Sequence, residues 1–271
     1  MVPPEIAQYL SRWSLREDGD VIETPMSRLL PVRRADGPAM LKLLKPGSDE
    51  RNAAGLLAYY DGQGAVRLFA ADDGALLMER ASGTRSLGAM ATGGRDDAAA
   101  DVLADAVAVL HAPRDQPPPA ALTPLSEQFA SLFDRDDQDA LLARCAAVAR
   151  RLLASAADRL PLHGDLHHGN VLDGGARGWL AIDPKGLIGE RTYDVANLLR
   201  NPWPHGNLVH SRARMQRLAR RYADRLDLDP RRVLDFAFAH AGLSACWDME
   251  DGEDPAYSLA CAEVLSSLSD A

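Results

Sequence analysis

The sequence has little cysteine and no long apolar run. Its 271 residues include three cysteines, Cys145, Cys246 and Cys261, and no CxxC pair, so we expect neither a disulfide framework nor a zinc cage. Nowhere do enough apolar residues follow one another to span a membrane, and the first residues lack the basic and apolar segments of a signal peptide. These absences favour a soluble protein in a reducing compartment, the cytoplasm.

Positive charge is also scarce. Thirty Lys and Arg residues against 39 Asp and Glu residues give a formal net charge of −9. This sign is wrong for broad contact with nucleic acid or an anionic membrane, and we expect neither as a partner, whereas a cationic small molecule would be attracted. The content of hydrophobic residues, 46%, is that of an ordinary globular protein and excludes disorder over most of the chain.

The first part of the chain, residues 1–80, contains short runs rich in Val, Ile and Leu. They predict five strands, over residues 20–23, 28–34, 39–45, 66–70 and 75–79. Turn residues separate neighbouring runs, as in antiparallel hairpins. Ser48, Asp49 and Glu50 supply a cap and first-turn acids for one helix that ends at Gly62. We therefore predict an N-terminal lobe made of an antiparallel sheet and one helix.

The second part, residues 81–271, is mainly helical. Apolar residues at spacings of three and four predict helices over residues 96–111, 126–133, 136–160, 208–226 and 230–247. One segment, residues 160–187, interrupts this pattern, and its apolar pairs on either side of a glycine turn predict a hairpin. The fold class is therefore α+β, with a small sheet lobe followed by a helical lobe.

The segment HGDLHHGN, residues 163–170, is followed by Asp183 in IDPKG. Phosphoryl transfer needs a carboxylate that orients or deprotonates the attacking hydroxyl, and Asp165 supplies it. Five residues later, Asn170 supplies an amide oxygen for a metal ion. The predicted hairpin returns Asp183 to the same cleft as a second ligand. Carboxylate and amide oxygens suit a hard cation such as Mg²⁺.

The histidines of this segment allow a second interpretation. His163, His167 and His168 together with Asp165 could form a transition-metal site of a hydrolase. Neighbouring histidines in a loop point apart, and no further histidine is placed to complete such a site. We therefore favour His163 as a packed, hydrogen-bonded residue of the loop.

Lysine is rare in this chain, which has Lys42, Lys45 and Lys185 but 27 arginines. On an alternating strand Lys42 and Lys45 lie on opposite faces. A flexible point charge that faces a cleft suits phosphate groups, where Arg would be bulkier and forked. Lys42 is the candidate for this role, and a solvated lysine at a strand end is the alternative.

The segments HGDLHHGN and IDPKG, followed by GERTYDVANL at residues 189–198, resemble the aminoglycoside phosphotransferase family, in particular its streptomycin 6-kinase and hydroxyurea kinase branch. The likeness runs over nearly the whole chain and is strongest over residues 163–201. It implies a bilobal protein-kinase-like fold with a hinge near residues 79–83. It also implies ATP- and Mg²⁺-dependent phosphorylation of a hydroxyl group, with 6-phosphorylation of streptomycin, which inactivates the antibiotic, as the favoured reaction.

The resemblance also implies roles for individual residues. Asp165 is the catalytic carboxylate, Asn170 and Asp183 hold magnesium, Lys42 reaches the α and β phosphates, Glu50 pairs with Lys42, the backbone from Glu79 to Ala81 receives adenine, and His163 and Asp194 fix the catalytic loop. The first turn, residues 23–27, has no glycine, in contrast to protein kinases. We therefore expect the hydroxyls of Thr24 and Ser27, or backbone N–H groups, to cover the phosphates.

The acceptor site is less distinct. Asp248, Glu250, Asp251, Glu253 and Asp254 form an acidic run beside Trp247, and such a run is usually a solvated loop. Carboxylates and an aromatic face also suit the guanidinium groups of streptomycin, so Trp247, Glu250 and Asp251 are candidate contacts. Trp203 either lines the same cleft or packs in the core. Other acceptors, such as hydroxyurea or choline, and a non-catalytic nucleotide-binding pseudokinase are the alternatives; oligomeric state is left open.

Overall fold

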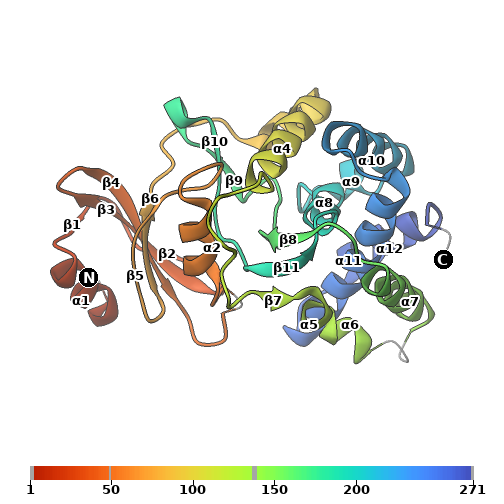
Figure 1. Ribbon diagram of the computed structural model, residues 1–271, viewed down its shortest axis with the longest axis horizontal. Coiled ribbons are helices and arrows are strands. Elements are labelled where there is room, and N and C mark those ends of the chain that lie inside the picture. The colour runs from red at the N-terminus through yellow and green to blue at the C-terminus, as the bar shows by residue number, and fades with distance from the viewer. Residues whose placement is uncertain (1–2, 49, 136–138, 270–271) are drawn as a thin grey trace.

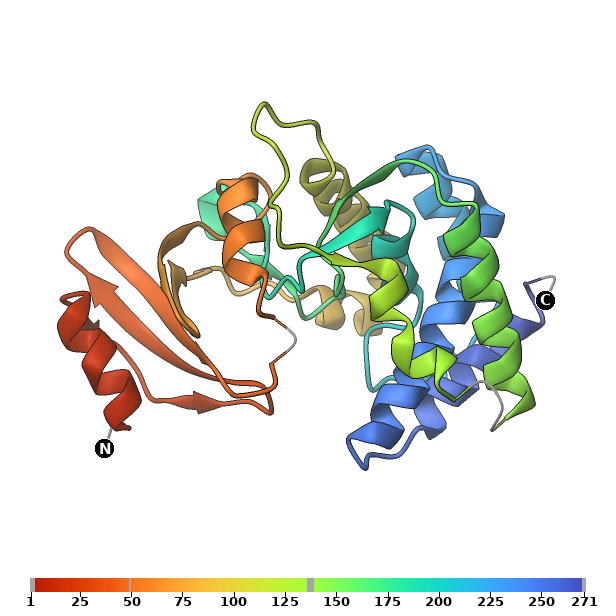
Figure 2. The same ribbon diagram turned by 60° about the horizontal axis from the view of Figure 1, so that its bottom comes forward.

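The computed structural model describes residues 3–48, 50–135 and 139–269, which form two lobes along the long axis of the molecule (Figure 1). The sheet and α1 lie at one end, and the helices of the C-terminal lobe lie at the other. Figure 2 shows α2 on the side of the sheet that faces those helices. The predicted α+β class is confirmed. Among the described residues, none of the helices is both long and apolar enough to span a bilayer.

The N-terminal lobe contains a six-stranded antiparallel sheet. Its strands are β1 (Arg16–Glu17), β2 (Ile22–Glu23), β3 (Ser27–Arg34), β4 (Gly37–Leu44), β5 (Leu68–Asp72) and β6 (Ala75–Glu79). They pair in the order β1-β3-β4-β6-β5, and β2 pairs with β3. Five of the strands correspond to predicted runs. The sixth, β1, was not predicted, because two exposed residues carry no alternating pattern.

Two helices cover this sheet, where the sequence analysis predicted one. The additional helix is α1 (Pro4–Arg12), whose Ile6 and Tyr9 pack against Leu77 and other residues on one face of the sheet. The predicted helix, α2 (Ala53–Tyr60), packs on the other face with Leu76 and its neighbours. Consecutive residues of β6 thus point to opposite faces, as the period of a strand requires. Because α2 begins at residue 53, Glu50 lies before the helix and not in its first turn.

The C-terminal lobe is built around one long buried helix, α11 (Pro230–Glu250), in which residues 233–246 are all buried. The other helices are α3 (Leu87–Met90), α4 (Asp96–Leu110), α5 (Leu125–Gln128), α6 (Ala130–Phe133), α7 (Ala140–Ala154), α8 (Tyr193–Leu199), α9 (Gly206–Val209), α10 (Arg212–Leu226) and α12 (Ala256–Ser266). The carboxylate of Asp139 caps α7. The predicted start of that helix, at residue 136, lies outside the described residues.

Short strands connect the helices. The predicted hairpin is present as β9 (Val171–Asp173) and β10 (Trp179–Ala181). A second, three-stranded sheet joins β7 (Thr123–Pro124), β11 (Leu187–Glu190) and β8 (Arg159–Leu162). The hairpin also contacts the N-terminal lobe: Ala181 exchanges backbone hydrogen bonds with Gly64 and Val66, at 2.8 and 3.0 Å. Backbone bonds therefore join the two lobes along β10.

Candidate active site

The loop that follows β8 is hydrogen-bonded to the carboxylate of Asp194, in the first turn of α8. The N–H groups of His163 and Gly164 donate to the two oxygens of its carboxylate, at 3.0 and 2.7 Å. His111 Nε2 lies 2.8 Å from the same carboxylate. Burial alone would raise the pKa of Asp194, but the bonds from His111 and from the loop amide keep it below its ordinary value. The structure thus places His163 and Asp194 together at the base of the loop.

His163 is fully buried, and both of its ring nitrogens have partners in the loop. Its Nε2 lies 2.8 Å from the carbonyl oxygen of Ile182, while Nδ1 accepts a bond from the N–H of Asp165 at 3.3 Å. Burial lowers the pKa of His163, in keeping with a neutral ring that donates at one nitrogen and accepts at the other. The ring therefore orients the loop and has no lone pair to offer a metal ion.

Asp165 is a half-buried carboxylate whose oxygens have different surroundings. Oδ1 accepts from Asn197 Nδ2 at 2.9 Å, and Oδ2 lies 3.3 Å from Asn170 Nδ2. The same Nδ2 donates to the Asp165 carbonyl at 2.9 Å. Since Asn170 uses its amino group in this way, its amide oxygen remains available to another partner.

Asp183 lies next to Asn170 because the N–H of Ile182 donates to the carbonyl of Asn170 at 2.9 Å. Its backbone adopts a left-handed conformation, with φ of 57°, which is uncommon outside glycine and clusters at functional sites. Asp183 Oδ1 lies 2.8 Å from Lys42 Nζ, and Glu50 Oε2 lies 2.5 Å from the same nitrogen. The structure therefore joins Lys42 on β4 to two carboxylates, one from each lobe.

These residues fit a hard divalent cation. Asn170 would hold Mg²⁺ through its amide oxygen and Asp183 through a carboxylate oxygen, with water and phosphate oxygens as the remaining ligands. Within residues 3–48, 50–135 and 139–269, His, Cys, Asp and Glu form no group of three or more that could hold a metal ion.

The predicted nucleotide contacts near the turn and hinge have partners within the protein. The Thr24 hydroxyl bonds the Ser27 hydroxyl at 2.9 Å and accepts from the Ser27 N–H, and Ser27 is buried. These hydroxyls therefore close the turn between β2 and β3. The Glu79 carboxylate accepts bonds from Arg177 and from the Arg67 N–H. Ala81 follows β6 in a segment that belongs to no helix or strand.

The sequence of this chain matches a known protein family. The sequence model described as "Aminoglycoside/hydroxyurea antibiotic resistance kinase" matches residues 12–252. The chain belongs to this family. The predicted resemblance to aminoglycoside phosphotransferases and hydroxyurea kinases is thus confirmed.

Individual relatives are similar over most of their length. The chain is 48% identical to streptomycin 3''-kinase of Klebsiella pneumoniae, covering 90% of this chain and 92% of the relative. It is 34% identical to streptomycin 6-kinase of Streptomyces griseus, covering 93% and 84%. The solved structure of aminoglycoside phosphotransferase APH(4)-Ia has a TM-score of 0.68 at 14% identity, over 97% of this chain and 98% of that one. The bilobal kinase-like fold is confirmed.

The predicted acceptor residues lie in different parts of the C-terminal lobe. Trp247, on α11, has the Lys185 ammonium 4.4 Å from its ring centroid. Glu250 accepts from the Ser131 hydroxyl at 3.0 Å and has Arg135 Nε at 3.5 Å. Asp251 is exposed at the end of α11. Trp247 is thus close to the loop through Lys185, whereas the Glu250 carboxylate is already paired.

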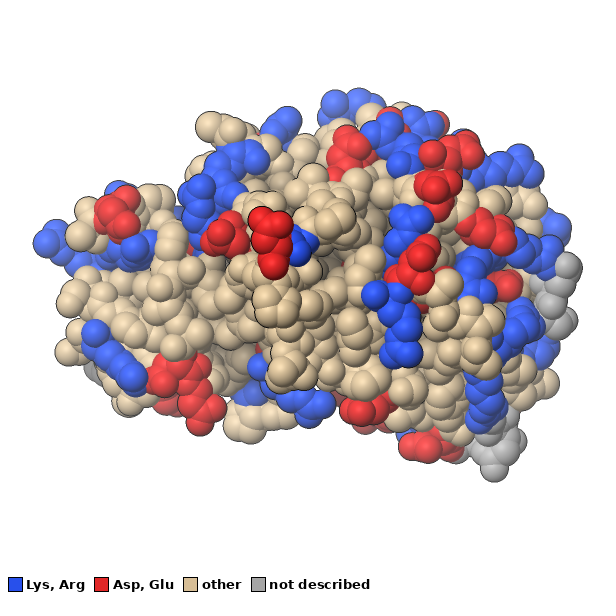
Figure 3. Space-filling model, in the orientation of Figure 1, with Lys and Arg blue, Asp and Glu red and all other residues tan. Residues whose placement is uncertain are grey.

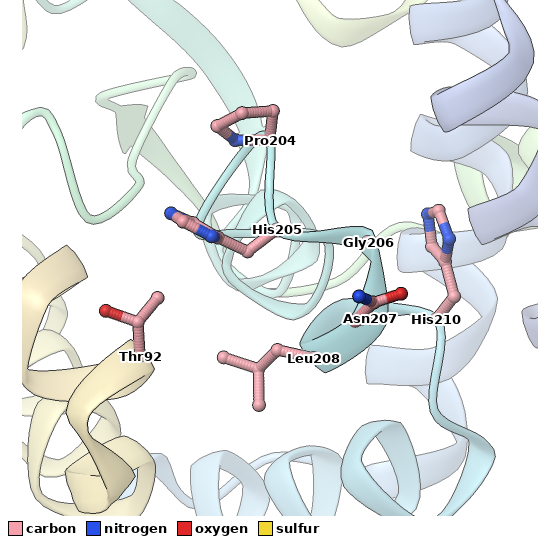
Figure 4. Close-up of a pocket in the computed structure, with 7 residues that line it drawn as sticks. All are labelled: Thr92, Pro204, His205, Gly206, Asn207, Leu208 and His210. Atoms are coloured by element: carbon pink, nitrogen blue, oxygen red, sulfur yellow. The ribbon is translucent and has the colours of Figure 1, made fainter.

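Trp203 lies elsewhere, on the wall of a cavity of about 560 Å³ that also touches His167 and His168 of the catalytic loop. It is 68% exposed, so it does not pack in the core. A neighbouring cavity of about 710 Å³ shares Thr92 and His205 with the first. Figure 4 shows Thr92, in the segment after α3, across this cavity from Leu208. Trp203 therefore faces a hollow on the α3 side of the loop.

Asn197, Arg200 and His111 received no role from the sequence. Asn197 bonds Asp165, Arg200 bonds Asn197, and His111 bonds Asp194. A signal for Asn197 was present, because it lies three residues after Asp194 and therefore on the same face of a helix. Arg200 lies three residues after Asn197, but its other partners, Ser244 and Ser258, come from distant parts of the chain, as does the partner of His111.

Proposed function

We propose that the protein is an ATP-dependent O-phosphotransferase that acts on a hydroxyl group of streptomycin. The observation that carries this proposal is the convergence of Asp165, Asn170, Asp183 and Lys42 through the contacts described above. Membership of a family of aminoglycoside and hydroxyurea kinases supports the reaction class.

In the proposed reaction, Asp165 orients the acceptor hydroxyl and accepts its proton. The hydroxyl oxygen bonds the γ-phosphorus of ATP while the bond from that phosphorus to the β–γ bridging oxygen breaks and ADP leaves. Oδ2 is the more available oxygen of Asp165, because its bond from Asn170 is the longer one, at 3.3 Å, whereas Oδ1 accepts from Asn197 at 2.9 Å. Lys42, held by Glu50 and Asp183, contacts the nucleotide phosphates. Magnesium, held by Asn170 and Asp183, would offset the charge on the phosphate oxygens when bound. Catalysis then depends on alignment and electrostatics, as in other phosphoryl transfers.

The position of phosphorylation has two candidates. The identity of 48% to a streptomycin 3''-kinase, against 34% to a 6-kinase, supports the 3''-hydroxyl. The sequence resemblance favoured the 6-hydroxyl. The proposed product is therefore streptomycin 3''-phosphate, and streptomycin 6-phosphate is the second candidate.

Recognition of the acceptor is proposed to use both walls of the site. The face of the Trp247 ring suits a guanidinium group of streptomycin, which would take the place of the Lys185 ammonium there. Asp251 is an exposed acid beside this residue, and Glu250 would have to exchange Arg135 for the acceptor cation. Trp203 would cover an apolar sugar face on the other wall. Neutralising Glu250 and Asp251 together should then raise KM for streptomycin but not for a neutral acceptor.

The proposal is tested by incubating the purified protein with Mg²⁺, ATP and a panel of streptomycin, other aminoglycosides, hydroxyurea and choline. We expect ADP release with streptomycin, a product that has gained one phosphate by mass spectrometry, and a position assigned by NMR. Asp165→Ala should lower kcat by about 10²–10⁴-fold. The control Asp105→Ala removes an exposed carboxylate on α4 and should leave kcat unchanged. ATP binding without turnover on any acceptor would instead indicate a pseudokinase.

A further inference from the structure

The side chain of Asn197 is buried beneath the catalytic carboxylate, and its amide has a fixed orientation. Its Oδ1 accepts from Asn201 Nδ2 at 3.0 Å and from Arg200 Nη1 at 3.3 Å. An arginine has only donors, so this side of the amide must be the oxygen. The amino group therefore points the other way, toward Asp165 Oδ1 at 2.9 Å.

Asn201 confirms this orientation because its own amide is fixed by the backbone. Its Nδ2 donates to the carbonyl of Asn197 at 2.9 Å, and its Oδ1 accepts from the N–H of Trp203 at 3.1 Å. Turning either amide around would place two donors or two acceptors against each other. The donor that faces Asp165 is thus specified by several bonds that do not involve Asp165.

Arg200 is anchored on the far side by two helices. It donates to the Ser244 hydroxyl on α11 at 2.6 Å and to the Ser258 hydroxyl on α12 at 2.8 Å. Ser258 in turn donates to Asp248 at 2.6 Å. A fixed positive charge beyond the oxygen of an amide polarises it and strengthens the bond that its N–H group donates. Arg200 therefore both holds Asn197 and increases its strength as a donor.

We propose that Asn197, fixed by Arg200, is a positioning residue for phosphoryl transfer. By binding Oδ1 of Asp165, it sets the plane of the carboxylate and leaves Oδ2 directed at the acceptor hydroxyl. Asn197 is buried, so it acts through Asp165 and does not contact the substrate. This inference rests on the proposed function, in which Asp165 receives the proton of that hydroxyl. It also assigns Asp248, part of the acidic run, to this network through Ser258.

An Asn197→Asp variant separates this role from simple packing. Aspartate has the same shape and still accepts bonds from Arg200 and Asn201, but it cannot donate to Asp165. We expect kcat to fall about 10–100-fold, while the Kd for ATP, measured by direct binding, stays within about twofold. Asn197→Ala should give a fall of similar size. Arg200→Lys should give a smaller one, since lysine keeps the charge but gathers its donors on one nitrogen, whereas Arg200 reaches Asn197 and Ser244 through Nη1 and Ser258 through Nη2.

Ser211→Ala is the control for a loss of stability alone. Ser211 caps α10 by accepting a bond from the Arg214 N–H, away from Asp165, so its removal should lower the melting temperature without changing kcat. Each variant is assayed where its melting curve shows it folded. If kcat stays within twofold of the wild type in the folded variants, or falls only in parallel with ATP binding, the inference is overturned. A wild-type protein that phosphorylates no acceptor would overturn the proposed function as well.

Discussion

At the scale of one residue, Lys42 is a lysine in a chain whose basic residues are mostly arginines, 27 in number. Its surroundings explain why a lysine suits this position. The side chain is 1% exposed, and its ammonium lies between Glu50 and Asp183. A compact charge with three donors can serve two carboxylates and still reach a phosphate oxygen, whereas a planar guanidinium is larger and has fixed donor directions. The ammonium therefore links the sheet to the carboxylate of Glu50, which precedes α2, and to the carboxylate of Asp183 in the other lobe.

Removal of this charge should act on the nucleotide. Lys42→Ala should lower kcat/KM for ATP by about 10²-fold or more, because it leaves two carboxylates facing the phosphates. Steady-state kinetics with varied ATP measure the effect. Lys45→Ala is the matched comparison: Lys45 bonds the Thr24 carbonyl at the β2–β3 turn and should matter less. If the Lys45 variant is the more impaired, the assignment of the phosphate-binding lysine is wrong.

The sequence predicted Asp165, Asn170 and Asp183 because the chemistry and the spacing lie within one short stretch of chain. The residues expected to bind the acceptor were harder to predict, since the side chains around them come from distant segments of the chain. Nothing near Trp203 in the sequence reveals that it is exposed and lines a cavity, and nothing near Glu250 reveals its pairing with Arg135. Likewise, the bond between Thr24 and Ser27 depends on the exact path of the turn.

At the scale of elements, α4 and α10 are joined by a ladder of ion pairs. Aspartates on α4 alternate with arginines on α10, at Asp96, Asp97, Asp101 and Asp105 against Arg214, Arg217, Arg221 and Arg225. The arginines of α10 follow one another at spacings of three and four, and Asp97, Asp101 and Asp105 of α4 at spacings of four, with Asp96 next to Asp97, so each set lies along one side of its helix. Figure 3 shows acidic and basic side chains intermingled over this part of the surface. Only the first pair, Asp96 with Arg214, is buried.

The two ends of the ladder should differ in their effect on stability. Asp96→Ala leaves the buried Arg214 without its carboxylate and should lower the free energy of unfolding by about 3 kcal/mol or more. Asp105→Ala, at the exposed end, should lower it by about 1 kcal/mol or less. Urea denaturation of both variants measures the difference. Equal losses would mean that burial does not determine the strength of these pairs.

The long amphipathic helices were predictable, and the elements that were missed lack a periodic pattern. In α8 every residue is buried, so no polar face marks it as a helix. In α12 small and apolar residues occur all round. The sequence signal for α1 was present, with Ile6 and Tyr9 at helical spacing, but it was not recognised. The late start of α2 reflects Glu50, whose carboxylate is bonded to Lys42.

At the scale of the whole molecule, stability should depend on pH through three buried histidines, His163, His168 and His240. Burial lowers the pKa of each, that of His168 to about 3. The unfolded chain takes up protons on these residues below about pH 6.5, whereas the folded protein does not. Their contribution is therefore complete above that pH and is lost as the pH falls toward 3.

His168 should lower the free energy of unfolding by about 1.4 kcal/mol per pH unit below about pH 6 and above its folded pKa of about 3, and the lowered pKa values of His163 and His240 should add to this loss. Urea denaturation at pH 7, 6 and 5 measures how steeply the free energy of unfolding falls with pH. In His168→Gln this fall should be smaller by the contribution of one histidine. Asp194, with its lowered pKa, adds a further loss only near and below pH 4. A free energy that does not change between pH 7 and 5 would contradict this account.

The backbone bonds that join the two lobes along β10 have a consequence for turnover. The backbone bonds of Ala181 with Gly64 and Val66 join the segment before β5 to the C-terminal lobe, so this side of the sheet is held to that lobe. For the proposed turnover of ATP, we expect the lobes to open with these bonds as the pivot and most widely at the opposite margin of the sheet, where β2 and β3 turn. The rate at which ADP escapes is thus expected to follow the motion of that loop tip.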